Sequence, residues 1–183
     1  MLPTFETARL LVRARSMADF EDCLAMDRDP DVTRYVPGPW ADERAHRRFL
    51  TGRMTARFGK GLGYWSIVPR ERPEHFLGWV LLIPDAGIGP EIEIGWRLNR
   101  HAWGKGHATE AAAPIVDHAF TTLALEQIIA VIHPGNGASM RVAEKIGLRQ
   151  VRHTPEARTY ALGRKDWQTQ AGRSPHESPR KSL

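Results

Sequence analysis

The sequence has one cysteine, no long hydrophobic run and no metal-binding spacing of histidines, and each shortage excludes a class of protein. Cys23 cannot form an internal disulfide, and alone it cannot build a thiolate metal cluster. No run of about 18 apolar residues is present, so we expect no membrane-spanning helix. None of the eight histidines follows H-x-x-x-H or H-E-x-x-H spacing, so we predict no bound metal. The first residues are too polar and acidic for a secretory signal, so we expect a cytoplasmic protein.

The net charge of +5 is spread along the 183 residues rather than gathered in one basic stripe. Residues 1–60 carry 11 basic and 9 acidic groups, residues 61–170 carry 12 and 11, and residues 171–183 carry 3 and 1. This distribution argues against direct nucleic-acid binding. The length predicts a single domain over residues 1–170, followed by a polar tail, 171–183, that we expect to be disordered.

One stretch, from Glu91 to Phe120, joins a strand pattern to a helix pattern through a glycine turn. Its first eight residues alternate between polar and apolar, which is typical of a strand. After Trp103-Gly104-Lys105-Gly106-His107-Ala108, apolar residues recur at three- and four-residue steps, as on an amphipathic helix. The first N–H groups of such a helix lack internal partners and lie at the positive end of its dipole, so the turn could bind an anion.

Two common phosphate-binding motifs do not fit this turn. A P-loop requires G-x-x-x-x-G-K-[ST], but Gly106 follows Lys105, and the residue five before Gly104 is not a glycine. A Rossmann fingerprint requires a third glycine where Thr109 stands, and an acid at the end of the next strand. Glu126 has roughly the right separation from the turn, but it begins that strand instead.

The turn instead resembles the pyrophosphate-binding motif of the GNAT N-acyltransferase superfamily, [QR]-x-x-G-x-[GA]. Gly106 and Ala108 match the motif, whereas Trp103 replaces its first residue. A second stretch, from Asn136 to Leu148, resembles the other hallmark of the superfamily, an Asn-x-x-Ser/Ala helix closed by Lys-x-Gly and an apolar residue. The chain from Phe5 to Trp167 resembles the RimJ/RimL-like branch in four further segments: Glu6-Thr7-x-Arg9-Leu10, Glu93-Ile-Gly-Trp96, Thr109-Glu110-Ala111 and Tyr160-Ala-Leu162.

This resemblance implies an α+β fold of three layers, with a mixed, mostly antiparallel sheet of about seven strands and helices on both faces. It also implies acetyl-CoA as cosubstrate, wedged where the strand Glu91–Leu98 splays from a strand at Gln127–Ile132. Gly95 could mark a bulge that frees an amide of the first strand. The residues expected to contact the cosubstrate are Trp96, Arg97, Leu98, Trp103, Gly104, Lys105, Gly106, His107, Ala108, Thr109 and Asn136.

Glu93 is the candidate general base, with Glu91 on the same face of the strand as the alternative. At pH 7 a lysine amine is neutral in roughly one molecule in 2,500, whereas an N-terminal amine is neutral in about one in ten. A carboxylate acting through water therefore suits an α-amine better. Many family members place a tyrosine near the leaving thiolate, but Ala143 occupies that position here, so Ser139 is the candidate thiolate partner. Asn136 is either a ligand contact or simply the cap of its helix.

We expect an N-acetyltransferase that acts by direct attack of a primary amine, most simply a protein or peptide N-terminal α-amine. A small-molecule amine acceptor (an aminoglycoside, a polyamine or an amino acid) and a non-catalytic acyl-CoA-binding regulator are the alternatives. The acceptor surface is expected from Val32–Trp40 and from the turn near Thr154–Arg158, and carboxylates there would favour a polycation. The oligomeric state, including a homodimer, stays open at this point.

Overall fold

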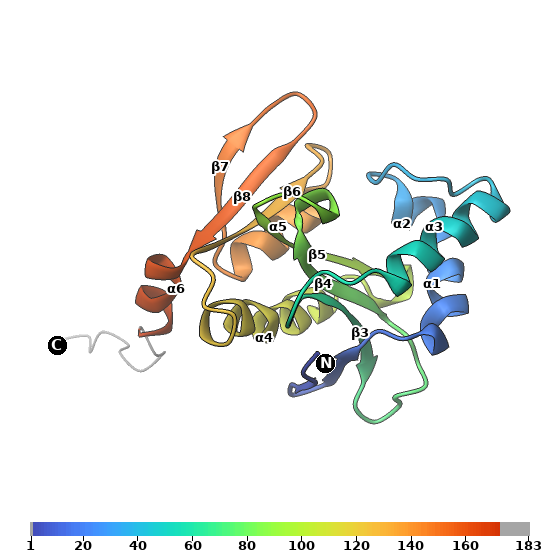
Figure 1. Cartoon of the computed structure of the whole chain (residues 1–183), viewed down its shortest axis with the longest axis horizontal. Coiled ribbons are helices and arrows are strands. Elements are labelled where there is room, and N and C mark those ends of the chain that lie inside the picture. Colours follow the sequence, from blue (N-terminus) through green and yellow to red (C-terminus); the bar gives the residue numbers. More distant parts are fainter. Residues whose placement is uncertain (1, 173–183) are drawn as a thin grey trace, which may run out of the picture.

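The computed structural model describes residues 2–172, which form one eight-stranded sheet with helices packed on both faces (Figure 1). The order of the strands in the sheet is β1-β2-β3-β4-β5-β6-β8-β7. Their bounds are β1 Phe5–Glu6, β2 Leu10–Ala14, β3 Gly63–Pro69, β4 Gly78–Pro84, β5 Ile92–Leu98, β6 Gln127–Ile132, β7 Arg149–His153 and β8 Arg158–Gly163. The α-helices are α1 Phe20–Asp27, α2 Pro30–Thr33, α3 Glu43–Thr55, α4 His107–Thr121, α5 Gly137–Lys145 and α6 Arg164–Ala171.

The predicted fold class is confirmed, with one strand more than expected. The extra strand is β1, which pairs with β2 through the partners Phe5↔Val12 and Glu6↔Leu11. A two-residue strand is too short to show an alternating pattern in the sequence. Most of the predicted disordered tail, residues 173–183, lies outside the described part of the chain.

The sheet opens between β5 and β6. All other neighbouring strands run antiparallel, whereas β5 and β6 are parallel and pair only at Glu93↔Ile129. Beyond that pair the two strands separate toward the carboxyl end of β5. The predicted splay between these strands is therefore present in the structure.

Two hydrophobic clusters cover the two faces of the sheet. The larger cluster includes Ile94 and Leu98 of β5 and packs against α4 and α5. The smaller cluster joins Leu24 of α1 and Leu50 of α3 to Trp79 of β4. Because side chains alternate along a strand, the odd-numbered residues of β5 face α1 and α3.

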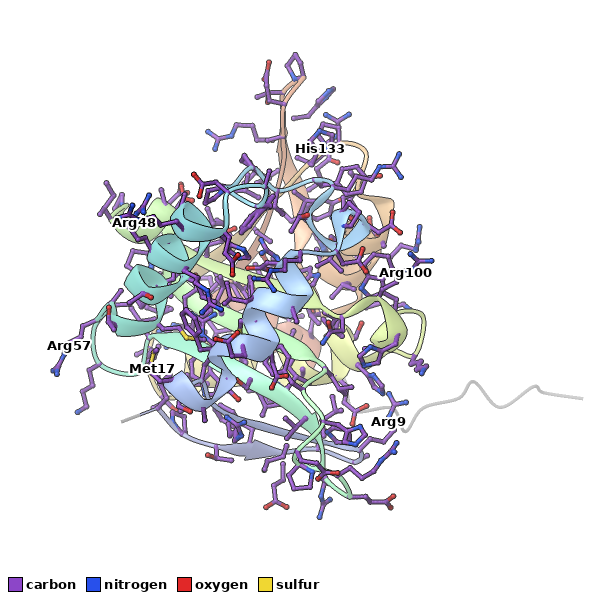
Figure 2. The ribbon with its side chains drawn as sticks, turned by 90° about the vertical axis from the view of Figure 1, so that its right-hand side faces the viewer. Arg9, Met17, Arg48, Arg57, Arg100 and His133 are labelled. Carbon is purple, nitrogen blue, oxygen red and sulfur yellow. The ribbon has the colours of Figure 1, made fainter. Side chains whose placement is uncertain are left out.

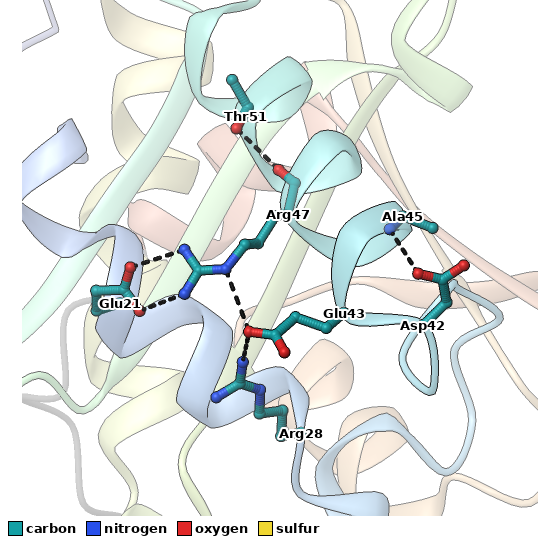
Figure 3. Close-up of polar contacts among 7 residues, drawn as sticks. All are labelled: Glu21, Arg28, Asp42, Glu43, Ala45, Arg47 and Thr51. Carbon is teal, nitrogen blue, oxygen red and sulfur yellow. Dashed lines mark hydrogen bonds and ion pairs between the residues drawn. The ribbon is translucent and has the colours of Figure 1, made fainter.

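Helices α1 and α3 lie side by side and are also joined by exposed ion pairs (Figure 3). Arg47 of α3 contacts Glu21 of α1 at 2.9 Å, and Glu43 of α3 contacts Arg28 at 3.0 Å. These side chains are largely exposed, so their contribution to the free energy of unfolding is small. The buried contacts between Leu24, Leu50 and their neighbours hold the two helices together.

Candidate functional site

A cavity of about 560 Å³ lies where β5 and β6 separate. One wall comes from β5, β6 and the start of α5, including Trp96, Asn136 and Ser139. The opposite wall comes from residues of α1 and α3, including Asp27, Leu50 and Arg53. The two segments expected to form the acceptor surface reach this cavity, since Tyr35 and Trp40 line it from one segment and Glu156 and Ala157 from the other.

Past its single pair with β6, the edge of β5 that faces the opening has no neighbouring strand from the described residues. Asn99 donates its N–H to the carbonyl of Leu77, and Asp85 donates to the carbonyl of Glu91, each at 2.8 Å. In an antiparallel ladder the hydrogen-bonded residues alternate, so the odd-numbered residues of β5 bond to β4. The even-numbered Trp96 and Leu98 therefore direct their N–H and C=O groups toward the opening. Of these groups, the carbonyl of Leu98 accepts a hydrogen bond from Trp103 Nε1 at 2.8 Å.

The same alternation corrects two predictions, the main-chain contact of Arg97 with the cosubstrate and the bulge at Gly95. Arg97 pairs with Trp79, so its main chain is turned toward β4 and only its side chain lines the cavity. The bulge expected at Gly95 is wrong, because the β4–β5 register is continuous from Gly78↔Leu98 to Pro84↔Ile92. A Cβ on Gly95 would lie 3.3 Å from the Leu81 side chain, so close packing explains the glycine.

The glycine turn that was predicted to precede the helix is formed. Gly104 and Gly106 have φ of +72° and +80°, a left-handed conformation that favours glycine. Gly106 is the N-cap of α4, and the first intrahelical bond runs from the N–H of Glu110 to the carbonyl of Gly106 at 3.0 Å. The N–H groups of His107, Ala108 and Thr109 consequently have no intrahelical acceptor and surround the open end of the helix.

The N-terminal segment holds this turn in place. Glu110 accepts hydrogen bonds from the Thr7 hydroxyl at 2.6 Å, from the Arg9 main-chain N–H at 2.8 Å and from Arg9 Nε at 2.7 Å. Arg9 also donates to the carbonyl of Lys105 at 3.0 Å. Burial acts to raise the pKa of Glu110, but the bonds from Thr7 and Arg9 outweigh it and the pKa is lowered. The sequence segments around Arg9 and Glu110 are thus two halves of one contact.

Burial and then the nearby Arg9 lower the pKa of His107, which favours its neutral form. Lys105 is exposed at the tip of the turn, and Trp103 is 46% exposed beside it. The turn therefore offers main-chain donors in the centre and cationic side chains, Lys105 and Arg9, at its rim.

Asn136 and Ser139 lie together at the start of α5. The side-chain oxygen of Asn136 accepts a hydrogen bond from the Ser139 N–H at 3.1 Å, so Asn136 caps the helix. Both residues also line the cavity, so the capping role does not remove Asn136 from the site. Ala143 is fully buried and packs in the larger core cluster, so the position of the family's tyrosine contributes no polar group here.

Glu93 is the carboxyl group whose environment suits a general base. It is half-buried on the cavity wall, and burial followed by the charge of Asp85 raises its pKa to about 7. A backbone hydrogen bond from Val131 and the charge of Arg53 act in the opposite direction. Glu91 is exposed, so the structure favours Glu93 over Glu91.

A buried charged group beneath the cavity was missed by sequence reasoning. Arg97 Nη1 lies 2.6 Å from Asp27, and His46 Nε2 lies 3.4 Å from the other oxygen of that carboxylate. The Arg97 guanidinium is also 5.1 Å from the ring centroids of both Trp40 and Trp79. The signal in the sequence was weak. It consisted of two polar residues, Asp27 and His46, at inward positions of α1 and α3, near Leu24 and Leu50.

Within residues 2–172, no three metal-ligating side chains gather into a group that could hold an ion. None of the helices in the described part of the chain combines the length and hydrophobicity needed to cross a bilayer.

Comparison with known proteins gives consistent relatives. Residues 9–149 match the family described as acetyltransferase (GNAT) domain. The uncharacterized protein YkkB of Bacillus subtilis (strain 168) is 35% identical over 141 residues, which cover 75% of this chain and 81% of YkkB. The uncharacterized N-acetyltransferase p20 of Bacillus licheniformis is 28% identical over 81% of this chain and 84% of its own length. The crystal structure of an acetyltransferase from Agrobacterium tumefaciens str. C58 superposes with a TM-score of 0.75 at 30% identity, covering 88% of this chain and 95% of that one.

Proposed function

The chain belongs to the GNAT acetyltransferase family and is an acyl-CoA-dependent N-acetyltransferase, and we propose that its acceptor is the α-amine of a protein or peptide. The observation that carries this proposal is Glu93, a half-buried carboxyl group on the cavity wall with a pKa of about 7. The resemblance to the RimJ/RimL-like branch supports the same acceptor class.

The cosubstrate would lie along the edge of β5, on the cavity wall, and reach the N-terminus of α4 outside the cavity. The free N–H groups of His107, Ala108 and Thr109 and the nearby Lys105 suit a pyrophosphate, and each charge-assisted hydrogen bond is worth about 1.5–3 kcal/mol. The exposed main-chain groups of Trp96 suit the amides of a pantetheine arm, which would continue the sheet as an added strand.

The pKa of the base decides which amine it can serve. A carboxyl group with a pKa of about 7 is a stronger base than an ordinary glutamate, and about half of it is ionised at pH 7. An α-amine with a pKa of about 7.7–8 loses its proton to such a group with little free-energy cost, whereas a lysine amine near 10.4 costs over 3 kcal/mol more. The pKa of Glu93 therefore favours an α-amine as the acceptor.

The reaction we propose has no covalent enzyme intermediate. Glu93, directly or through water, takes the proton of the acceptor ammonium, and the amine nitrogen forms a bond to the thioester carbonyl carbon. The C–S bond then breaks, the extra proton still on the nitrogen passes to the departing sulfur, and CoA leaves as the thiol with a hydrogen bond from Ser139, which lines the same cavity. Asn136 fixes Ser139 at the first turn of α5.

Release of the CoA thiol from acetyl-CoA against two pools of amines tests this proposal. One pool contains short peptides with free N-termini, and the other contains polyamines and aminoglycosides. Release with peptides alone is the expected result. Release with the second pool alone overturns the acceptor assignment, and silence with both pools while acetyl-CoA binds favours a non-catalytic regulator.

A further inference from the structure

Two arginines, Arg15 and Arg53, lie in the cavity on the same side of the sheet as Glu93. Arg15 follows β2, and its main-chain N–H bonds to the carbonyl of Tyr64 at 3.0 Å. Its guanidinium lies 3.7 Å from the Tyr64 ring centroid and donates to the carbonyl of Arg53 at 3.4 Å. Arg53 comes from the last turn of α3, and its guanidinium lies 5.5 Å from the ring centroid of Phe49. Aromatic rings thus orient both cations without neutralising them.

Neither guanidinium has a carboxylate partner among residues 2–172. Every ion pair in that part of the chain involves other residues. Of the carboxylates nearby, Asp27 already holds Arg97 and His46, and Glu93 is the proposed base. Arg15 is partly buried, and burial lowers its pKa against the opposing effects of Cys23, Tyr64 and Asp27. A cation that is desolvated and unpaired is stabilised by an anion brought from outside.

We propose that the acceptor carries a carboxylate close to its amine, and that Arg15 and Arg53 bind this carboxylate while Glu93 takes the proton of the amine. This inference rests on the proposed transfer to an α-amine and adds the charge of the acceptor. The planar fork of a guanidinium matches the two oxygens of a carboxylate, and two arginines that carry such a fork line this cavity. Such a carboxylate is present in the side chain of an acidic first residue of a peptide, and also in the α-carboxylate of a free amino acid.

The surface next to the cavity extends the same charge. A neighbouring pocket of about 390 Å³ shares Arg15, Arg53 and Tyr64 with the cavity and adds Arg57 and Lys60. All charged residues that line it are basic. Figure 2 shows that Arg57 points outward from this side of the molecule. A polyamine or an aminoglycoside would face four cations here, so this surface favours an acidic acceptor over a polycation.

The test compares peptides that differ only in charge, Asp-Ala-Ala-amide and Asn-Ala-Ala-amide, with free aspartate as a third acceptor. Binding of the N-acetylated products to the enzyme with CoA, measured by calorimetry, does not require turnover. We expect the acidic product to bind about tenfold or more tightly than the neutral one, as for a charge-assisted pair. Arg15→Gln and Arg53→Gln should each reduce that preference toward unity, and Arg53→Lys should retain part of it.

The matched control is Arg48→Gln, an exposed arginine on the same helix as Arg53 and outside the cavity (Figure 2), which should keep the full preference. Equal binding of acidic and neutral products, or a preference unchanged in both arginine variants, overturns the inference. Turnover of both peptides at equal rates leaves the acetyl transfer intact and removes only the anion site. Selective binding of the acidic product without turnover of any acceptor supports the anion site and contradicts the proposed acetyl transfer. Free aspartate reacting better than the acidic peptide identifies an amino acid as the acceptor.

Discussion

The regions proposed to bind the cosubstrate and the acceptor, called here the cosubstrate half and the acceptor half of the site, present different parts of the chain to their ligands. The cosubstrate half presents main-chain groups: the edge of β5 at Trp96, on the cavity wall, and the open end of α4 after Gly106, which lies beyond the residues that line the cavity. The acceptor half presents side chains, the carboxyl of Glu93 and the guanidinium groups of Arg15 and Arg53. A main-chain site binds a feature shared by all acyl-CoA molecules, whereas a side-chain site can change its ligand by single substitutions. The difference separates a site that depends on the backbone of the fold from one that depends on individual side chains.

The largest expected effect lies in the acceptor half. Glu93→Gln removes the base, and kcat/KM for CoA release should fall by about 10²–10⁴-fold, with acetyl-CoA affinity unchanged. Because the base works when deprotonated, wild-type kcat/KM should rise with pH through about 7 and then level, and the variant should lose this inflection. Glu91→Gln, on the exposed end of the stretch, is the control and should leave the pH profile as it is.

Glu93→Gln lowers activity but should make the protein more stable than the wild type at alkaline pH. The pKa of Glu93 in the folded chain, about 7, is above its ordinary value of 4.5, so its stabilising contribution is complete below pH 4.5 and is lost as the pH rises through 7. Relative to the wild type, Glu93→Gln should therefore melt higher at pH 8 than at pH 4.5. An unchanged difference in Tm between the two pH values would contradict the burial of this carboxyl group.

The buried pair beneath the acceptor half gives the next effect. Asp27→Asn leaves Arg97 without its counter-ion, and the free energy of unfolding should fall by about 3 kcal/mol in urea titrations. Glu21→Gln removes an exposed pair with Arg47 and should leave the urea midpoint almost unchanged (Figure 3). Equal losses in the two variants would show that Asp27 is hydrated rather than enclosed.

The cosubstrate half should respond to its backbone. Gly106→Ala places a side chain at φ +80°, which costs about 1–2 kcal/mol, and acetyl-CoA binding should weaken about tenfold by calorimetry. Gly52→Ala in α3 is the matched control, because a Cβ there meets nothing within 4 Å. That variant should bind acetyl-CoA normally and be slightly more stable. Tight binding by Gly106→Ala would remove the turn from the site.

The smallest effect is expected at Ser139. A neutral hydrogen bond is worth about 0.5–1.5 kcal/mol, so Ser139→Ala should lower kcat about two- to tenfold without changing the KM for the acceptor. Ala138→Ser, at the exposed neighbouring position, added to Ser139→Ala tests whether a hydroxyl elsewhere on this turn suffices and should not restore kcat. A loss as large as that of Glu93→Gln would make Ser139 an essential acid.

The cosubstrate half could be predicted because its signals are local. The alternation of residues 91–98, the glycines at 104 and 106 and the cap at Asn136 each act within a few residues of their own position. The acceptor half could not be predicted in the same way. Arg15 and Arg53 come from separate elements, and only the packing of α1 and α3 on the sheet brings them together.

Gly95 shows a limit of a different kind. A glycine within a strand is compatible both with a bulge and with close packing, and the sequence does not contain the position of Leu81 on the neighbouring strand. The pairing of Arg9 with Glu110 was likewise present in the sequence as two separate patterns. Their contact depends on β1 and β2 lying beside the start of α4, which is a property of the fold.

The open edge of β5 has a consequence for the lifetime of the protein. Its main-chain groups and those at the start of α4 gain their partners from the proposed cosubstrate, which binds only the folded chain. At a concentration 100 times its Kd, such a ligand adds about 2.7 kcal/mol to the free energy of unfolding, a large share of the 5–15 kcal/mol typical of a domain. Resistance to proteolysis should therefore follow the supply of acetyl-CoA, so that the amount of enzyme declines when the metabolite that it consumes becomes scarce.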